Sequence, residues 1–217
     1  MIQRQRRSAS AAKAQTRAYA ERLDELVPVL RAEVPAPARP NGAPILVVLM
    51  GQPGVGKSHC ARLLSARLDA AHLSSDHLRS RLFIAASYAP EESATIFAAM
   101  SSVLDLLLRE GHRVVLDATN LLARHRDASI SAARRRSIPI VHVRVTADEA
   151  ETLARLAHRR LSRGEDDHSD ADETIYRKMS AFEPPDGGHL ELRNGPALAA
   201  EVDRIVAEVE ARCGHAS

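Results

Sequence analysis

The chain contains 217 residues, of which 45% are hydrophobic, 27% charged and only 3% aromatic, a composition that fits one globular domain with an aliphatic core. No apolar run approaches the roughly 20 residues that a membrane-spanning helix needs, so we expect no membrane segment. Residues 1–42 carry 8 Lys and Arg against 4 Asp and Glu, whereas residues 43–217 carry 22 against 24, which excludes a strongly basic nucleic-acid-binding body.

Residues 1–42 read as an N-terminal extension. Its apolar stripe predicts a helix over about residues 10–33, and "VPAPARPNGAP" ends that helix as a Pro-rich linker. Because this linker separates the two parts, we expect residues 43–217 to form the catalytic domain and to fold alone. An Arg- and Ser-rich start is also typical of a mitochondrial transit peptide, and that alternative stays open. The stripe consists of Leu23, Leu26, Val27 and Leu30.

After the linker, short apolar runs alternate with amphipathic stretches. This alternation predicts a parallel sheet covered on both faces, an α/β three-layer sandwich with five strands. The predicted strands are 45–50, 71–74, 113–117, 140–145 and 189–192. The predicted helices are 57–68, 76–85, 90–109, 122–136, 148–162, 170–181 and 196–212.

A glycine-rich turn joins the first predicted strand to the first helix of the domain. It reads "GQPGVGKSH", in which the pattern G-x-x-x-x-G-K-S predicts a cradle for the phosphates of ATP. Glycines let the backbone approach phosphate oxygens, and the helix N-terminus adds positive potential. Lys57 would contact the β- and γ-phosphates and assist transfer, and Ser58 would bind Mg²⁺. The expected nucleotide-binding residues are Gly51, Gln52, Pro53, Gly54, Val55, Gly56, Lys57, Ser58 and His59.

Two further stretches bear on what happens to the terminal phosphate. A motor ATPase usually ends its second core strand with an acid pair, but "VVLDATN" has the single acid Asp117. A GTPase would need an N-K-x-D motif to recognise guanine, and the sequence contains none. In "LSSDHLRSRL", Asp76 follows a short strand, at the edge where open α/β sheets bind ligands. Arg79 lies one helical turn further on the same face. A carboxylate beside an arginine suits an acceptor hydroxyl, although Asp76 could instead be a helix cap.

The stretches "GQPGVGKS", "LSSDHLR", "VVLDATN" and "HSDAD" together resemble P-loop kinases of the polynucleotide 5′-hydroxyl kinase type, a group that also looks like zeta-toxin and small-metabolite kinases. The resemblance covers about residues 45–185. It implies that Asp76 is the general base and that Arg79 holds the acceptor. It further implies that Asp117 supports Mg²⁺ or its water shell, and we expect Asn120, in the same motif, to contact the acceptor.

The resemblance also implies a lid whose arginine closes over the transferring phosphoryl group. The segment "LARLAHRRLSRGEDDHSDAD" offers four candidates, of which we assign the catalytic role to Arg159, which shares a helix face with Arg155. A solvated charged face is the alternative, and Ser169 with Asp172 has the spacing of a helix cap. The four candidates are Arg155, Arg159, Arg160 and Arg163.

The expected activity is therefore ATP- and Mg²⁺-dependent transfer to an acceptor hydroxyl. The preferred acceptor is a nucleic-acid 5′-hydroxyl, approached along Arg124, Arg126 or Arg134–Arg136. A small metabolite or nucleotide sugar is the alternative, and so is a nucleotide-dependent switch with little transfer. The stretch "RNGP" (193–196) would border the adenine of ATP or form a simple turn. Two distant cysteines fit a reducing compartment, so we expect a cytoplasmic protein.

Overall fold

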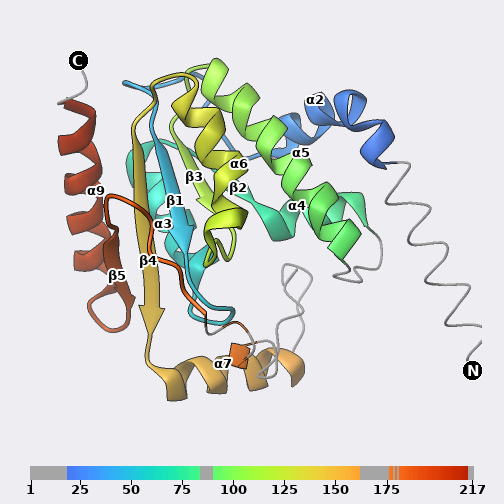
Figure 1. Cartoon of the computed structure of the whole chain (residues 1–217). Coiled ribbons are helices and arrows are strands. Elements are labelled where there is room, and N and C mark those ends of the chain that lie inside the picture. Colours follow the sequence, from blue (N-terminus) through green and yellow to red (C-terminus); the bar gives the residue numbers. More distant parts are fainter. Residues whose placement is uncertain (1–18, 84–89, 162–175, 178, 180, 215–217) are drawn as a thin grey trace, which may run out of the picture.

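The computed structural model describes residues 19–83, 90–161, 176, 177, 179 and 181–214, except for the side chains of 159–161. Its centre is a five-stranded sheet with the order β2-β3-β1-β4-β5 (Figure 1). All four pairings are parallel, which confirms the predicted α/β fold. The strands are β1 Leu46–Met50, β2 Ala71–Ser74, β3 Val114–Asp117, β4 Ile140–Ala147 and β5 Leu190–Asn194.

Helices cover both faces of the sheet and complete three layers. One hydrophobic cluster packs α2, α4, α5 and α6 against the sheet, and a second packs α3 and α9 against the other face. None of the described helices is long and apolar enough to cross a membrane. The helices are α2 Leu23–Glu33, α3 Lys57–Leu68, α4 Ser75–Leu82, α5 Pro90–Arg109, α6 Ala123–Arg134, α7 Glu149–Leu161 and α9 Leu198–Gly214.

The central strand β1 explains why both faces must be covered. All five of its residues are buried, and successive side chains point to opposite faces of a strand. Leu46 and Val48 accordingly join the cluster under α5, whereas Val47 and Leu49 join the cluster under α3 and α9. A continuous apolar run is therefore the sequence signature of a strand buried on both sides.

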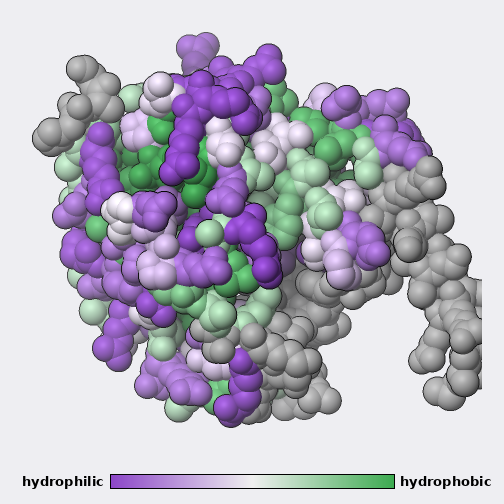
Figure 2. All heavy atoms as spheres, viewed as in Figure 1, coloured by the Kyte–Doolittle hydropathy of each residue, from purple (hydrophilic) through white to green (hydrophobic). Residues whose placement is uncertain are grey.

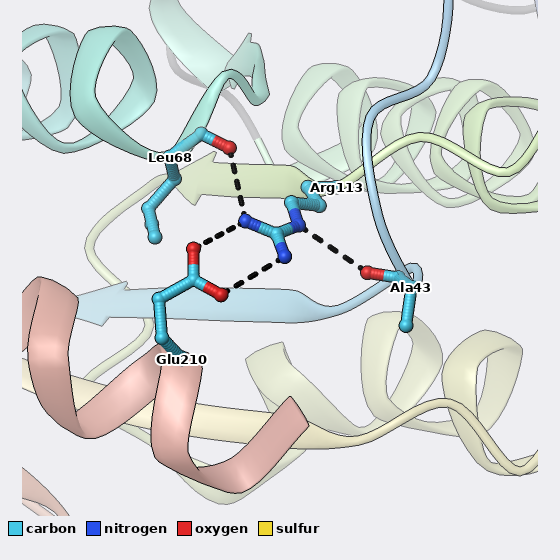
Figure 3. A network of polar contacts seen from close by, with 4 residues as sticks. All are labelled: Ala43, Leu68, Arg113 and Glu210. Carbon is cyan, nitrogen blue, oxygen red and sulfur yellow. Dashed lines mark hydrogen bonds and ion pairs between the residues drawn. The ribbon is translucent and has the colours of Figure 1, made fainter. Parts of the chain in front are cut away.

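The amino edge of the sheet is held together by Arg113, at the start of β3 (Figure 3). Its Nε donates to the carbonyl of Ala43, where the chain enters β1, and its Nη1 donates to the carbonyl of Leu68, where α3 ends. Its Nη2 donates to Glu210 of α9 at 3.0 Å. One guanidinium thus fixes three separate segments at the edge away from the phosphate-binding loop.

Residues 23–34 pack into the same core as the sheet. The helix α2 lies beside α5 (Figure 1), and the side chains of Leu30 and Val34 are each 4% exposed within the cluster that covers β1 and β3. Hydrophilic and hydrophobic residues are interspersed on the face shown in Figure 2. The division of the chain at residue 42 stays a prediction, and this packing opposes independent folding of residues 43–217.

Candidate active site

The phosphate-binding loop connects β1 to α3 at the carboxyl edge of the sheet. Gly54 and Gly56 have φ angles of +82° and +90°, which side-chain-bearing residues rarely adopt. A Cβ at Gly56 would lie 2.1 Å from Nδ2 of Asn194, and one at Gly54 would lie 2.8 Å from Cγ of Leu156. Both glycines are therefore required by backbone angle and by close neighbours, before any phosphate is considered.

Asn194, the last residue of β5, braces this loop. Its Nδ2 donates to the carbonyl of Val55 at 2.8 Å, and the side chain is buried. The sequence offered two interpretations of "RNGP", an adenine boundary or a simple turn, and neither includes this contact. Because Val55 and Asn194 are 139 positions apart, no local pattern could have revealed the brace.

Lys57 lies at the first position of α3, where the helix N-terminus also supplies positive potential. Its Nζ donates to the carbonyl of Gln52 at 2.8 Å, so the ammonium group turns back over the loop that it follows. Gln52 in turn donates from Nε2 to the carbonyl of Tyr176 at 3.4 Å. The ammonium group and the backbone N–H groups of the loop therefore lie close together, as a phosphate cradle requires.

Asp117 ends β3 beside this loop and is only 3% exposed. Burial by itself raises the pKa of the Asp117 carboxyl, but a hydrogen bond from His72, the charge of Lys57 and a hydrogen bond from Ser58 together lower it below its ordinary value. The distance between His72 Nε2 and Asp117 Oδ2 is 3.3 Å. The carboxyl group is therefore held as a buried anion next to the phosphate cradle.

The donor set of Ser58 and Asp117 fits Mg²⁺. A hydroxyl and an ionised carboxylate are hard oxygen ligands, and Mg²⁺ commonly takes one or two such ligands, with phosphates and water filling its other positions. Among the described residues, no group of three or more His, Cys, Asp or Glu could hold a metal ion without other ligands. A Mg²⁺ ion held by Ser58 and Asp117 would take its other ligands from phosphate and water.

Asp76 lies in the first turn of α4, which follows β2 at the same edge. Ser74, the last residue of β2, pairs in register with Asp117, the last residue of β3. Asp76 follows Ser74 by two residues, so Asp76 and Asp117 come from the ends of neighbouring strands. The helix cap is Ser74, whose hydroxyl oxygen accepts from the backbone N–H of His77 at 3.4 Å. The alternative interpretation of Asp76 as the helix cap is therefore wrong, and its carboxylate is half-buried at the edge.

Arg79 does not lie as the sequence suggested. It is 7% exposed, and its guanidinium forms an ion pair with Glu92 of α5, which is 2% exposed. We expected Arg79 to hold the acceptor from an open position, but the structure places it in a buried pair between two helices. Sequence reasoning did not identify Glu92, because 13 positions separate it from Arg79 and it looks like an ordinary first-turn acid.

Two other predicted contacts lie inside the protein. Asn120 is 0% exposed and donates from Nδ2 to the carbonyl of Leu49 at 2.8 Å, so this conformation does not present it to an acceptor. Arg126 is 2% exposed and donates to the carbonyls of Asn120, at 2.7 Å, and Glu183, at 2.8 Å. Both residues hold the loop after β3 in place, and neither provides the predicted contact with a nucleic acid.

The arginines at the end of α6 are also far from the cradle. The helix α6 begins at the carboxyl edge, where β3 ends, and Arg134–Arg136 end it next to the amino end of β4. Arg136 is paired with Asp105 of α5 at 3.0 Å. The prediction that Arg134–Arg136 line the acceptor approach is therefore wrong. Of the cations predicted there, Arg124 is exposed at the start of α6.

The helix α7 leaves β4 and packs on the phosphate-binding loop, where Leu156 contacts Gly54. Arg155 donates to the Thr152 hydroxyl at 3.4 Å. Burial and the charge of Asp117 raise the pKa of the Cys60 thiol to about 11, while the charges of Lys57 and Arg155 oppose this shift. Arg159 and Arg160 are on the last turns of α7, but their side chains, like Arg163, Ser169, Asp170 and Asp172, lie outside the described residues.

Comparison with protein families gives one match. The model AAA_33, described as an AAA domain, matches residues 46–185. This range begins with β1 and includes the phosphate-binding loop, Asp76, Asp117 and the arginines of α7. No curated protein matches the sequence.

Solved structures share the fold at low sequence identity. APS kinase CysC of Mycobacterium tuberculosis, solved with AMPPNP and APS, is 21% identical with a TM-score of 0.60, covering 78% of this chain and 99% of that one. A gluconokinase of Sinorhizobium meliloti is 17% identical with a TM-score of 0.59, covering 81% and 97%. Kti12 of Chaetomium thermophilum, solved with ADP-AlF3, is 20% identical with a TM-score of 0.62, covering 76% and 97%. These similarities establish a P-loop kinase fold.

Proposed function

The chain belongs to the AAA_33 family of AAA domains, and on that premise we propose that it is an ATP- and Mg²⁺-dependent kinase acting on a hydroxyl group of a small molecule. The observation that carries this proposal is that two acids lie at the edge of the sheet that holds the phosphate cradle. Asp117 ends β3, and Asp76 lies just after the neighbouring strand β2. Asp117 lies against Ser58 and Lys57, and Asp76 follows the strand that pairs with β3. A second carboxylate beside the cradle suits proton transfer from an acceptor.

The phosphate side of the reaction uses the loop and the first turn of α3. Lys57 and the backbone N–H groups around Gly56 would hold the β- and γ-phosphate oxygens, and no covalent step by the protein is needed. Ser58 and Asp117 would hold Mg²⁺, which neutralises charge on the phosphate oxygens when it is bound. The buried ion-pairing around Asp117 keeps that carboxylate ionised for this role.

The acceptor side uses Asp76. Its carboxylate would accept a hydrogen bond from the acceptor hydroxyl, orient the oxygen toward the γ-phosphate, and take the proton as the new P–O bond forms and the bond to the β-phosphate oxygen breaks. An arginine of α7, for which we keep Arg159, would approach the phosphoryl oxygens. Such a cation is worth about 10³–10⁵ in rate in other phosphoryl-transfer enzymes.

The sequence favoured a nucleic-acid 5′-hydroxyl, but a small acceptor now has better support. Of the arginines proposed to bind strand phosphates, Arg79 and Arg126 are paired or interior and Arg134–Arg136 lie at the opposite edge, which leaves Arg124 exposed at this edge. Nucleic-acid affinity depends on accessible cations that meet successive phosphates. Two of the structural neighbours, an APS kinase and a gluconokinase, are also named for small molecules.

A transfer screen tests the proposal. The full chain would be incubated with γ-labelled ATP and Mg²⁺ against sugars, polyols, nucleosides, nucleotide sugars and 5′-hydroxyl oligonucleotides. We expect label on a small molecule in the presence of Mg²⁺ and none when the metal is chelated. Labelling confined to oligonucleotides would restore the sequence-based acceptor and reject the one proposed here.

A further inference from the structure

Both arginines of α4 are already neutralised by glutamates from other helices. Arg79 pairs with Glu92 of α5 inside the protein, and Arg81 pairs with Glu33 of α2, with Nη2 and Oε1 2.7 Å apart. The helix therefore brings the Asp76 carboxylate to the carboxyl edge without bringing an uncompensated cation beside it. An acceptor that approaches Asp76 therefore meets a helix whose two arginines already have acidic partners, one inside the protein and one at its surface.

The Arg79–Glu92 pair is also difficult to open. Both side chains are almost fully buried, with residue exposures of 7% and 2%. An anionic acceptor that took the Arg79 guanidinium would separate it from the Glu92 carboxylate inside the protein. Breaking a buried ion pair is strongly unfavourable, because the interior replaces little of the lost hydration.

Two further described cations near this edge, Lys57 and Arg126, also have partners within the protein. Lys57 is turned over the phosphate-binding loop, and Arg126 is held by two backbone carbonyls. Among the described cations of this edge, Arg124 is exposed at the start of α6, whereas Arg79, Lys57 and Arg126 already have partners within the protein.

From this arrangement we infer that Glu92 is a specificity-determining residue, which cancels the charge of Arg79 so that the kinase accepts an uncharged hydroxyl compound, such as a sugar, polyol or nucleoside, over its phosphorylated or carboxylated counterpart. This inference rests on the proposed kinase function. Glu92 acts through Arg79 and takes no part in the chemistry. Replacing its carboxylate with an amide should return a positive charge to the acceptor side.

The first arm of the test measures anion binding without transfer. Inorganic phosphate is titrated by calorimetry into the full chain saturated with Mg²⁺ and ADP, for wild type, Glu92→Gln and Glu91→Gln. Glu91 is exposed in the same turn of α5, so its variant controls for the overall change of charge. We expect Glu92→Gln to bind phosphate about tenfold more tightly than Glu91→Gln, since one nearby charge is uncompensated. Equal dissociation constants in the two variants would overturn the inference.

The second arm uses matched acceptors with γ-labelled ATP: glucose with glucose 6-phosphate, ribose with ribose 5-phosphate, and uridine with uridine monophosphate. Wild type should label neutral members, and Glu92→Gln should shift relative kcat/KM toward the phosphorylated members. A wild-type preference for phosphorylated members would place the anion on another cation, such as Arg124, and overturn the inference.

If wild type labels no acceptor of any class, the kinase proposal fails, while the phosphate titration still decides the role of Glu92. If Glu92→Gln does not fold, as judged by its circular dichroism melting curve, the wild-type comparison of matched acceptors decides the inference alone.

Discussion

At the scale of single residues, two acids at the same sheet edge have different surroundings. Asp117 is buried and receives hydrogen bonds from His72 and Ser58, whereas Asp76 is half-buried in the first turn of α4. The first arrangement suits a fixed anion that holds a metal, and the second suits a group that meets an incoming hydroxyl. This difference assigns the two carboxylates to separate tasks in the proposed reaction.

Asp76→Asn tests the acceptor side directly. The amide keeps the shape of the side chain but cannot take a proton, so kcat should fall about 10²- to 10⁴-fold, the usual contribution of a positioned general base. Affinity for ATP, measured by calorimetry, should stay within a few-fold of wild type. Asp127→Asn, an exposed change on α6, is the control, and a kcat for Asp76→Asn equal to that of this control would remove Asp76 from the mechanism.

Sequence patterns predict the surroundings of a residue best where its neighbours are local. Gly56, Lys57 and Ser58 lie in one turn, so their neighbourhood follows from the motif itself. Arg79 and Asn120 were misplaced, because their partners, Glu92 and the carbonyl of Leu49, come from other elements. A side chain's availability to a ligand depends on which distant group reaches it first, and a linear pattern does not contain that information.

At the scale of elements, apolar periodicity located the five strands and the described helices from α3 onward to within a few residues, whereas most of the helix predicted over 170–181 and the start of the one predicted over 10–33 lie outside the described residues. The predicted helix 57–68 and strand 71–74 agree with α3 and β2. The helix predicted over 76–85 instead spans Ser75–Leu82, because Ser74 caps its start and Phe83 has extended backbone angles. Apolar residues after Leu82 prolonged the helical pattern in the sequence, and helix ends are the least certain part of such a prediction.

Arg159 is the test of α7 as a lid. If its guanidinium reaches the phosphoryl group only in the closed state, Arg159→Ala should lower kcat about 10³- to 10⁵-fold with little change in ATP affinity. The neighbouring change Arg160→Ala should have a small effect, because adjacent positions of a helix do not share a face. Stopped-flow transfer rates for both variants check this. A larger loss in Arg160→Ala would reassign the catalytic arginine.

The packing of α2 makes a stability prediction. Leu30 is 4% exposed in the core, whereas its neighbour Val29 is 58% exposed. Leu30→Ala should therefore reduce the free energy of unfolding by about 2–5 kcal/mol, through lost burial and an unfilled cavity. Urea denaturation measures this, with Val29→Ala as the control, expected within about 0.5 kcal/mol of wild type. Equal, small losses would mean that α2 is dispensable and that the domain begins after residue 42.

At the scale of the whole molecule, stability should fall in mild acid because of His142 on β4. Burial, together with the charges of Arg126 and Arg134, lowers the pKa of His142 to about 4. Between pH 6.5 and 4 the unfolded chain takes up a proton there that the folded chain does not, so the stability present above pH 6.5 is lost as the pH falls. The slope from this group is at most about 1.4 kcal/mol per pH unit.

Urea denaturation at pH 7, 6 and 5 measures that slope. His142→Gln removes the titrating group and should flatten the dependence, whereas His158→Gln, an exposed change on α7, should leave it near that of wild type. An unchanged slope in His142→Gln would show that acid acts through other groups.

The central claim is that the γ-phosphate is transferred to a hydroxyl rather than released to water. The most direct measurement is a single-turnover reaction with γ-labelled ATP, Mg²⁺ and a mixture of neutral hydroxyl compounds, in which label on organic acceptors and on inorganic phosphate is separated and counted. We predict that wild type places most of the label on an acceptor and that Lys57→Ala, folded by circular dichroism, places almost none. Label that appears only as inorganic phosphate, whichever acceptors are supplied, would contradict the assignment of a kinase and indicate an ATPase.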